Sequence, residues 1–235
     1  MPHATFVLFD LDGTLSDSAP GILASLRHAF DVNGIARLDA ETERSLLGPP
    51  FYVSLPPLIG QAATLEVITA YRERYQGGEM YNTVAYPGIS DLIAELFARG
   101  LRLAVATSKP EHYAVPIVEH LGLAPCFETV GGDELDGSLG SKALVIGKVL
   151  SRLGRPDPST VLMVGDRSHD IEGARAHGID AIGVAWGYAN PGELQAARPV
   201  ENCATVAELA RALEPSRALK PSRALSQDGA DAEAP

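Results

Sequence analysis

The chain has 235 residues, of which 46% are hydrophobic and 21% are charged, and its formal net charge is −11. This composition is typical of a globular protein with a sizeable core, formed by one large domain or by a core domain with a smaller insertion. The acidic charge argues against nucleic acid or an anionic membrane as a partner, because both require a basic face. We find no secretory leader and no apolar run that could span a bilayer, so we expect a cytoplasmic protein.

Short apolar runs alternate with helical patterns along most of the chain. The expected strands are residues 5–9, 101–106, 128–130, 161–164 and 181–184, and the clearest helices are residues 89–99 and 144–153. In the first of these helices one face is apolar and should be buried. That face contains Ile89, Leu92, Ile93, Leu96 and Phe97. The alternation predicts an α/β fold, a doubly wound, Rossmann-like parallel sheet with helices on both faces.

The segment 16–84 interrupts this alternation. It contains helical patterns at residues 22–30 and 65–75 with Pro and Gly between them, and we recognise no convincing strand in it. We therefore predict a small all-helical insertion, the cap (residues 16–84), after the first strand. The core domain would comprise residues 1–15 and 85–214. Residues 215–235 repeat Pro-Ser-Arg-Ala-Leu and are rich in Ala, Asp and Pro, so we expect a flexible tail.

Polar side chains cluster at the predicted strand ends. In open parallel sheets ligands bind beyond the carboxyl ends of the strands, so these side chains should be considered together. They are Asp10 and Asp12 after the first strand, Thr107, Ser108 and Lys109 after the second, Asp166 and Asp170 after the fourth, and Lys142 at the start of a helix. Such a set suits phosphoryl transfer, which needs a nucleophile, neutralising charge and a proton for the leaving oxygen.

The two aspartates of the first group have different expected roles. Asp10 ends a buried strand, so its carboxylate should be fixed in direction and can act as a covalent nucleophile. Asp12 lies two residues on and would point the same way on an ideal strand, where it can act as general acid and then as general base. As a carboxylate among other carboxylates, it should hold its proton more tightly than usual. Both residues could instead be structural turn formers before Gly13.

A metal site is the second expectation. Mg²⁺ prefers octahedral coordination by carboxylates, water and phosphate oxygens, and Asp10, Asp166 and Asp170 fit this preference. Asp170 would lie one turn into a helix that starts near Ser168. An acidic residue in the first turn of a helix is also favourable without any metal.

The remaining polar residues form the expected phosphate-binding set. Thr107 can donate its hydroxyl to phosphate, with help from backbone N–H groups that follow it, and we assign Ser108, Lys109 and Gly13 to the same set. Lys142 is the expected counter-charge to the nucleophile and to phosphate. Lys142 and Lys109 could each be solvated surface lysines instead. We interpret Arg167 and His169 as facing outward, and Trp186 and Tyr188 as core residues.

Four motifs appear in a fixed order: Asp10-Leu-Asp-Gly-Thr-Leu15, Ala-Thr107-Ser-Lys, Gly-Ser-Lys142 and Gly-Asp166-Arg-Ser-His-Asp170. Together they resemble the haloacid dehalogenase (HAD) superfamily, and the insertion is similar to its type-1 cap. The phrases Asp17-Ser18, Tyr86-Pro-Gly-Ile89 and Gly173-Ala-Arg-Ala-His-Gly178 resemble the phosphoglycolate phosphatase-like subgroup. The resemblance implies a Mg²⁺-dependent phosphatase that acts on a small phosphorylated metabolite through an aspartyl-phosphate. It also implies that the backbone carbonyl of Asp12 is a metal ligand. We expect a monomer or a homodimer.

Three alternatives stay open at this point. A dehalogenase of the same superfamily also uses an Asp nucleophile, but it does not need the second acid, Asp12. A sugar-phosphate mutase similar to β-phosphoglucomutase would keep all four motifs and differ in its cap. A signalling receiver module also carries a phosphorylated Asp, but it would not need a helical cap. Substrate contacts should come from the cap, where Leu47 to Tyr52 and Arg74 are candidates, and phosphoglycolate, nucleoside monophosphates and pyrophosphate are all consistent with the sequence.

Overall fold

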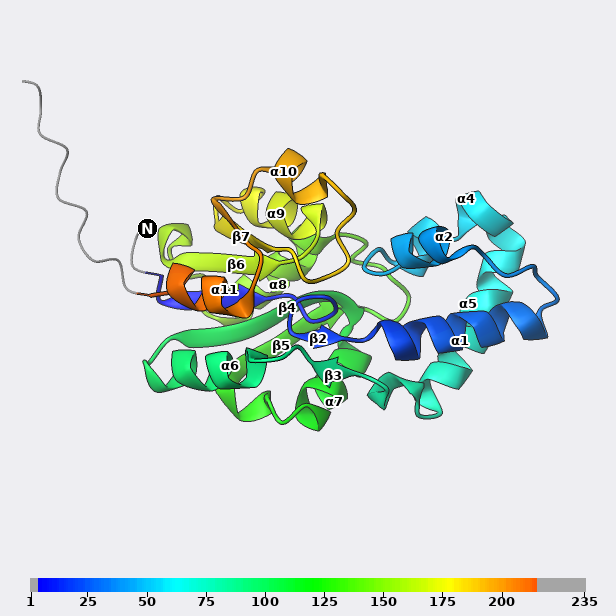
Figure 1. The fold of residues 1–235 in the computed structure, drawn as a ribbon, viewed down its shortest axis with the longest axis horizontal. Coiled ribbons are helices and arrows are strands. Elements are labelled where there is room, and N and C mark those ends of the chain that lie inside the picture. Colours follow the sequence, from blue (N-terminus) through cyan, green and yellow to red (C-terminus); the bar gives the residue numbers. More distant parts are fainter. Residues whose placement is uncertain (1–3, 215–235) are drawn as a thin grey trace, which may run out of the picture.

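A computed structural model describes residues 4–214, and the expected flexible tail lies outside the described residues. Within that range six parallel strands form one sheet in the order β5-β4-β1-β6-β7-β8 (Figure 1). The strands are β1 (Phe6–Phe9), β4 (Arg102–Pro110), β5 (Phe127–Asp133), β6 (Val161–Gly165), β7 (Asp180–Val184) and β8 (Glu201–Cys203). The predicted doubly wound α/β fold is confirmed. Among residues 4–214 no helix is long and apolar enough to cross a bilayer.

Strand β1 shows why the apolar runs form central strands. All four of its side chains are buried, with Phe6 and Leu8 in one core cluster and Val7 and Phe9 in the other. Because side chains alternate along a strand, an apolar run covers both faces of the sheet. The strand order runs outward from β1 in two directions, so the topological switch point lies at its carboxyl end.

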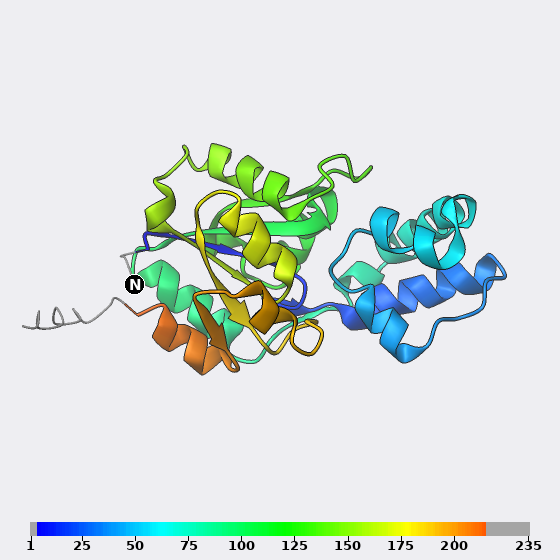
Figure 2. The same cartoon turned by 90° about the horizontal axis from the view of Figure 1, so that it is seen from above.

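Helices cover both faces of this sheet (Figures 1 and 2). One face carries α6 (Ile89–Ala98), α7 (Glu111–His120) and α11 (Val206–Ala212), and the other carries α8 (Lys142–Arg152) and α9 (Ser168–Arg175), with α10 (Glu193–Ala197) against α9. The predicted buried face of α6 is right except at Phe97, which is 51% exposed. Each residue turns the helix by about 100°, which places Phe97 past the edge of the apolar stripe.

The cap helices gather beyond the carboxyl ends of the strands rather than on a face of the sheet (Figure 1). They are α1 (Ala19–Val32), α2 (Ala40–Ser45), α3 (Phe51–Ser54), α4 (Pro56–Ile59) and α5 (Gln61–Gln76). The longest two, α1 and α5, pack against each other. We keep the name cap for residues 16–84, whose status as a separate domain stays a prediction.

The prediction that the cap segment contains no strand is wrong at its two ends. Strand β2 (Ser16–Asp17) pairs antiparallel with β3 (Val84–Ala85), so the two connections between cap and core run side by side. Strand β8 was also not predicted. These strands have two or three residues each and little apolar pattern, so they form through pairing with neighbours rather than through local sequence preference.

Candidate active site

The sheet topology brings the predicted residues together at the carboxyl end of β1. Phe9 pairs with Val105 of β4 and with Val164 of β6, so the residues that follow these three positions become neighbours. Strand β4 continues to Pro110, so Thr107, Ser108 and Lys109 lie in its last part and not, as expected, after it. The backbone N–H of Asp10 donates to the carbonyl of Val164 at 2.9 Å, which extends the contact between β1 and β6 by one residue. The nucleophile proposed from the sequence is therefore fixed at the switch point.

Three buried carboxylates meet there. Ligand oxygens of Asp10, Asp166 and Asp170 all lie within 4.8 Å of one another. Asp166 accepts the Thr14 hydroxyl at 3.0 Å and the backbone N–H of Tyr188 at 2.7 Å. One oxygen of Asp170, Oδ2, accepts the backbone N–H of Arg167 at 3.0 Å. The other, Oδ1, is buried and accepts no hydrogen bond from any residue that the structure describes.

Lys142 supplies positive charge to this cluster. Its Nζ lies 2.8 Å from Asp10 Oδ1 and 2.7 Å from Asp170 Oδ1, and it donates a hydrogen bond to the carbonyl of Ala106 at 2.9 Å. The short approach to Asp170 Oδ1 is thus an ion pair without hydrogen-bond alignment. Burial lowers the pKa of Lys142, but Asp10 and Asp170 outweigh it and raise the pKa above its ordinary value. The alternative of a solvated helix lysine is wrong.

The charge and the ligand oxygens of the cluster suit a divalent cation. One lysine beside three carboxylates leaves two buried negative charges without a compensating side chain. The pKa values reflect this uncompensated charge. Burial and the neighbouring carboxylates raise the pKa of Asp166 well above its ordinary value, and burial raises the pKa of Asp170 to about 6. Uncompensated buried charge is costly, and a cation coordinated by these oxygens would remove that cost. The three carboxylates therefore fit a divalent metal.

Asp12 faces a second lysine. The chain turns directly after β1, since the carbonyl of Leu11 accepts the N–H groups of Leu15 and Ser16, each at 3.0 Å, so the assumption that Asp12 continues an ideal strand is wrong. Asp12 Oδ2 lies 3.0 Å from Lys109 Nζ, and Oδ1 accepts the Ser18 hydroxyl at 2.5 Å. The charged partner of Asp12 is thus a lysine and not, as expected, another carboxylate.

Lys109 is buried rather than on the surface and connects Asp12 to the cap. Its Nζ donates to the hydroxyl of Tyr75 in α5 at 2.7 Å. Burial lowers the pKa of Lys109, but Asp12 and Tyr75 together raise it above its ordinary value. The partner lies 34 positions away in the sequence, which is why no local pattern indicated it.

The other members of the predicted phosphate-binding set lie in the same region. Thr107 is buried, and its hydroxyl accepts the backbone N–H of Lys109 at 3.2 Å. Ser108 lines the cavity described below. The N–H of Gly13 donates to the carbonyl of Ser16 at 2.8 Å and is not directed at a ligand.

Two glycines leave the space that Asp166 occupies. Gly13 has a φ of 85°, a conformation that favours glycine, and a Cβ there would overlap Asp166 Oδ2. A Cβ on Gly187 would overlap both the Gly13 carbonyl oxygen and Asp166 Oδ2. The predicted importance of Gly13 therefore has a packing reason in the structure.

Sequence reasoning missed two side chains that join the core to the cap. Arg167 is buried and does not face outward. Its Nε donates to Glu193 at 2.9 Å and its Nη1 donates to the carbonyl of Leu47 in the cap. The Tyr188 hydroxyl donates to Asp17 at 2.8 Å, so Tyr188 does more than fill the core. Arg167 lies between Asp166 and Asp170 in the fourth motif, and this position is the sequence feature that could have indicated a role at the site.

Two further aromatic or imidazole side chains lie beside the cluster. The indole Nε1 of Trp186 donates to the carbonyl of Thr14 at 3.1 Å, so Trp186 supports the loop that follows Asp10. His169 is half-buried, and burial together with Arg167 lowers its pKa. Its position lines a second hollow, next to Lys142.

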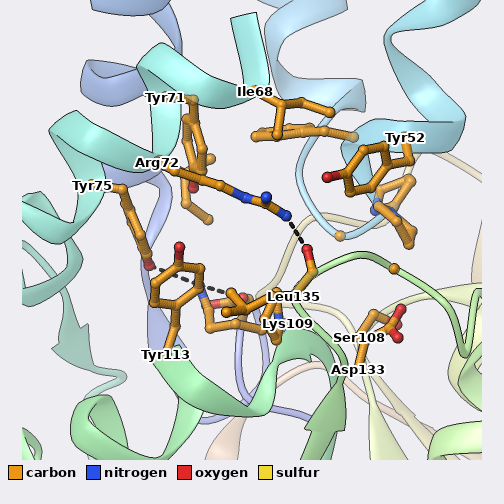
Figure 3. Close-up of a pocket in the computed structure, with 18 of the residues that line it drawn as sticks. Tyr52, Ile68, Tyr71, Arg72, Tyr75, Ser108, Lys109, Tyr113, Asp133 and Leu135 are labelled. Atoms are coloured by element: carbon orange, nitrogen blue, oxygen red, sulfur yellow. Dashed lines mark hydrogen bonds and ion pairs between the residues drawn. The ribbon is translucent and has the colours of Figure 1, made fainter. Parts of the chain in front are cut away.

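A cavity of about 110 Å³ lies between the cap and the core (Figure 3). Asp12, Ser108 and Lys109 line it from the core. Its cap residues are mostly aromatic or apolar and include Phe51, Tyr52, Ile68, Tyr71, Arg72 and Tyr75. Arg74 is not among its lining residues, because it faces another surface and pairs with Glu79 at 2.6 Å. The positions of Ile68, Tyr71, Arg72 and Tyr75 follow the i, i+3, i+4, i+7 spacing of one helical face, a signal that could have selected Arg72 instead of Arg74.

Residues 7–184 match the family model described as haloacid dehalogenase-like hydrolase. The chain belongs to this family. The resemblance inferred from the four motifs is confirmed, and the α/β fold agrees with it.

Relatives of this HAD-like hydrolase carry different names. A protein named tyrosine-protein kinase PtkA, from Mycobacterium tuberculosis strain H37Rv, is 43% identical over 88% of this chain and 72% of its own length. A 5'-nucleotidase from Pseudomonas aeruginosa is 37% identical over 88% of this chain and 94% of its own. A phosphoglycolate phosphatase from Chromobacterium violaceum is 34% identical, over 90% and 98% of the two chains.

The fold of this hydrolase is also that of solved structures. A predicted phosphatase from Clostridium acetobutylicum superimposes with a TM-score of 0.84 and 33% sequence identity, over 90% of this chain and 98% of that one. The superposition covers both the parallel sheet and the cap segment, since it extends over nine-tenths of the chain.

Proposed function

We propose that this chain is a Mg²⁺-dependent phosphatase that hydrolyses a small-molecule phosphate monoester through an aspartyl-phosphate on Asp10. The observation that carries the proposal is the buried cluster of Asp10, Asp166 and Asp170 around the single cation of Lys142. The enzyme class predicted from the sequence, a phosphoric monoester hydrolase, is that of the 5'-nucleotidase and phosphoglycolate phosphatase relatives. The cytoplasmic location stays a prediction.

In the first step the Asp10 carboxylate forms a bond to phosphorus while the bond from phosphorus to the leaving oxygen breaks. Oδ1 of Asp10 is held by Lys142 and by the N–H of Leu11 at 2.8 Å, which leaves Oδ2 for the attack. Lys142 offsets the negative charge of Asp10 and of the phosphoryl group. Bound Mg²⁺ would be held by Asp10, Asp166 and Asp170 and would neutralise charge on the phosphoryl oxygens.

Asp12 manages the protons in both steps. It gives a proton to the leaving oxygen, and it then accepts a proton from the water that attacks the phosphorus of the aspartyl-phosphate. The second attack breaks the bond between phosphorus and Asp10, releases inorganic phosphate and restores the carboxylate. Ser18 and Lys109 hold the two oxygens of Asp12 in place. The cap, which Lys109 also contacts through Tyr75, keeps bulk water from the intermediate.

The experiment is a phosphate-release assay over a panel of esters with Mg²⁺ and with excess chelator. We expect release in Mg²⁺ and none in chelator, because the carboxylates would otherwise repel the substrate. Rapid quench followed by mass spectrometry should find added phosphate on the peptide that contains Asp10. Full activity after verified metal removal, or a phosphate label on a Ser or His, would contradict the proposal.

A second candidate function is phosphoryl transfer to a tyrosine hydroxyl. It is favoured by one observation, the 43% identity to the protein named tyrosine-protein kinase PtkA. Here the γ-phosphoryl group of ATP would pass to the phenolic oxygen, which loses its proton, and ADP would leave. Incubation with γ-labelled ATP and a tyrosine-containing peptide separates the two functions, since a kinase labels the peptide and a phosphatase releases the label as inorganic phosphate.

A further inference from the structure

Arg72 in α5 is the cation of the cap–core cavity that lacks a carboxylate partner within residues 4–214. The other cation that lines the cavity, Lys109, is paired with Asp12. The guanidinium of Arg72 crosses the cavity and donates to the backbone carbonyl of Leu135, and it lies 5.5 Å from the centroid of the Tyr52 ring (Figure 3). Neither contact supplies a negative charge.

Three acidic residues of the segment that contains Leu135 (Asp133, Glu134 and Asp136) lie near Arg72, and among the described residues none of them forms an ion pair with it. Asp133 accepts the backbone N–H of Glu134 at 2.7 Å and that of Leu139 at 3.1 Å. Glu134 pairs with Lys148 at 2.8 Å. Hydrogen bonds from Ser138 and, to a smaller extent, the charge of Arg72 lower the pKa of Asp136, an exposed carboxylate that forms no ion pair with Arg72 within residues 4–214. An anionic ligand in the cavity would therefore give Arg72 a direct charge partner.

The chemistry of the side chain indicates which ligand. A guanidinium carries five N–H donors in a planar fork, and one of them bonds to Leu135. Carboxylates and phosphates accept two parallel hydrogen bonds from that fork, which a carbonyl cannot do. The cavity wall beside Arg72 is formed by Ile68 and the rings of Tyr71 and Tyr75, which bring no carboxylate to compete with an anionic ligand.

The cavity also fixes where the anion would lie relative to the chemistry. Asp12, which protonates the leaving oxygen, is in the core lining, and Arg72 reaches the same cavity from the cap. A leaving group that extends from Asp12 toward the cap would meet Arg72. The cavity volume of about 110 Å³ can hold a short leaving group. The aromatic contacts Phe51–Tyr71 and Tyr71–Tyr75, with centroids 4.8 and 5.2 Å apart, keep the wall rigid.

We propose that Arg72 determines substrate specificity by binding an anionic group, a carboxylate or a second phosphate, on the short alcohol that leaves. This inference rests on the proposed phosphatase function and narrows its substrate class. On binding, the hydrogen bond from the guanidinium to the Leu135 carbonyl is replaced by hydrogen bonds to the anion. Arg72 then has a negatively charged partner.

The test compares three esters of similar length: 2-phosphoglycolate, ethane-1,2-diyl bisphosphate and the neutral 2-hydroxyethyl phosphate. We expect the wild type to prefer at least one anionic ester, the carboxylate or the bisphosphate, which identifies the source of the charge. Arg72→Met should lower kcat/KM for that ester by about 10- to 100-fold, the range of a hydrogen bond to a charged group, and leave the neutral ester within about threefold. Arg72→Lys, which keeps charge but not the fork, should lose less than Arg72→Met.

Arg74→Met is the matched control, since Arg74 lies two positions away on the same helix and outside the cavity. Equal losses on neutral and anionic esters, equal losses in the Arg74 variant, or no anionic preference in the wild type would each overturn the inference. Melting temperatures of all variants show whether they fold.

If the wild type hydrolyses none of the esters, the proposed function fails. Calorimetric binding of 2-phosphoglycolate and the bisphosphate to Asp10→Asn, with and without Arg72, then tests the inference alone.

Discussion

The two sides of the active site are held in different ways. The floor, formed by Asp10, Asp166, Asp170 and Lys142, sits at strand ends, and its carboxylates accept backbone or hydroxyl donors from the core itself. The roof, formed by Phe51, Tyr52, Ile68, Tyr71, Arg72 and Tyr75 of the cap, is packed through aromatic rings. It reaches the core through the Tyr75 hydroxyl and the Arg72 guanidinium.

This difference indicates a division of labour. A floor fixed by many directional bonds suits a reaction that needs atoms in set positions. A roof fixed mainly by packing can change its side chains without disturbing that geometry. Floor variants should therefore lower turnover of every ester, whereas roof variants should change the ranking of esters. The following experiments test this comparison.

The largest effect is expected for Asp10→Asn. The amide is nearly isosteric but cannot act as the nucleophile, so phosphate release should fall below detection for all esters. The melting temperature should change little. Asp91→Asn is a suitable control, because Asp91 is exposed on α6 and is not part of the carboxylate cluster. Turnover close to that of the wild type in Asp10→Asn would show that Asp10 is not the nucleophile.

Asp12→Asn should have the next largest effect. Loss of general acid–base help costs typically about 10²–10⁴-fold, and the cost should be smaller for esters with good leaving groups, which need little protonation. The second step still lacks its base, so aspartyl-phosphate should accumulate on Asp10. Rapid quench and mass spectrometry measure that adduct. An equal loss of turnover for all esters, without any aspartyl-phosphate adduct, would indicate that Asp12 has a structural role only.

Tyr75→Phe sharpens the comparison, because Tyr75 belongs to the roof but bonds to Lys109, the partner of Asp12. Removing one hydroxyl should lower kcat by up to about tenfold, and similarly for neutral and anionic esters. Tyr113→Phe is the matched control, since its hydroxyl accepts a hydrogen bond from Gln76 rather than from Lys109. A change in ester ranking in the Tyr75 variant would place it with Arg72 instead.

The smallest effect concerns the ion pair between Glu193 and Arg167, the core residue that also contacts the cap at Leu47. Burial raises the pKa of Glu193, but hydrogen bonds from Arg167 and from backbone N–H groups outweigh it and lower the pKa to about 2. A depressed carboxyl pKa stabilises the fold above the unfolded value of about 4.3, and that contribution is lost as the pH falls toward 2. Glu193→Gln should therefore lower the melting temperature at pH 7 by a few degrees. The difference from the wild type should shrink progressively below about pH 4. A difference independent of pH would exclude the ionised pair as its cause.

Much of the floor could be predicted from the sequence, because its residues follow apolar strands whose ends must meet in a parallel sheet. Asp10 and Asp166 are of this kind, and Lys142 opens a helix next to them. The contacts of Lys109 could not be predicted, since its charge partner follows a tight turn and Tyr75 lies in a different segment. Arg72 is intermediate: the helical spacing contained the answer, but a choice between Arg72 and Arg74 required the phase of α5 relative to the cavity.

The space around Asp166 has a consequence for mutagenesis. At most positions, substitution by alanine removes a side chain and measures what that side chain contributed. At Gly13 and Gly187 the same substitution adds a methyl group where the Asp166 carboxylate already lies. The loss of activity in an alanine scan would therefore measure displacement of the Asp166 carboxylate at these two positions. Gly13 and Gly187, which have no side chains, would show losses as large as those of the aspartates next to them.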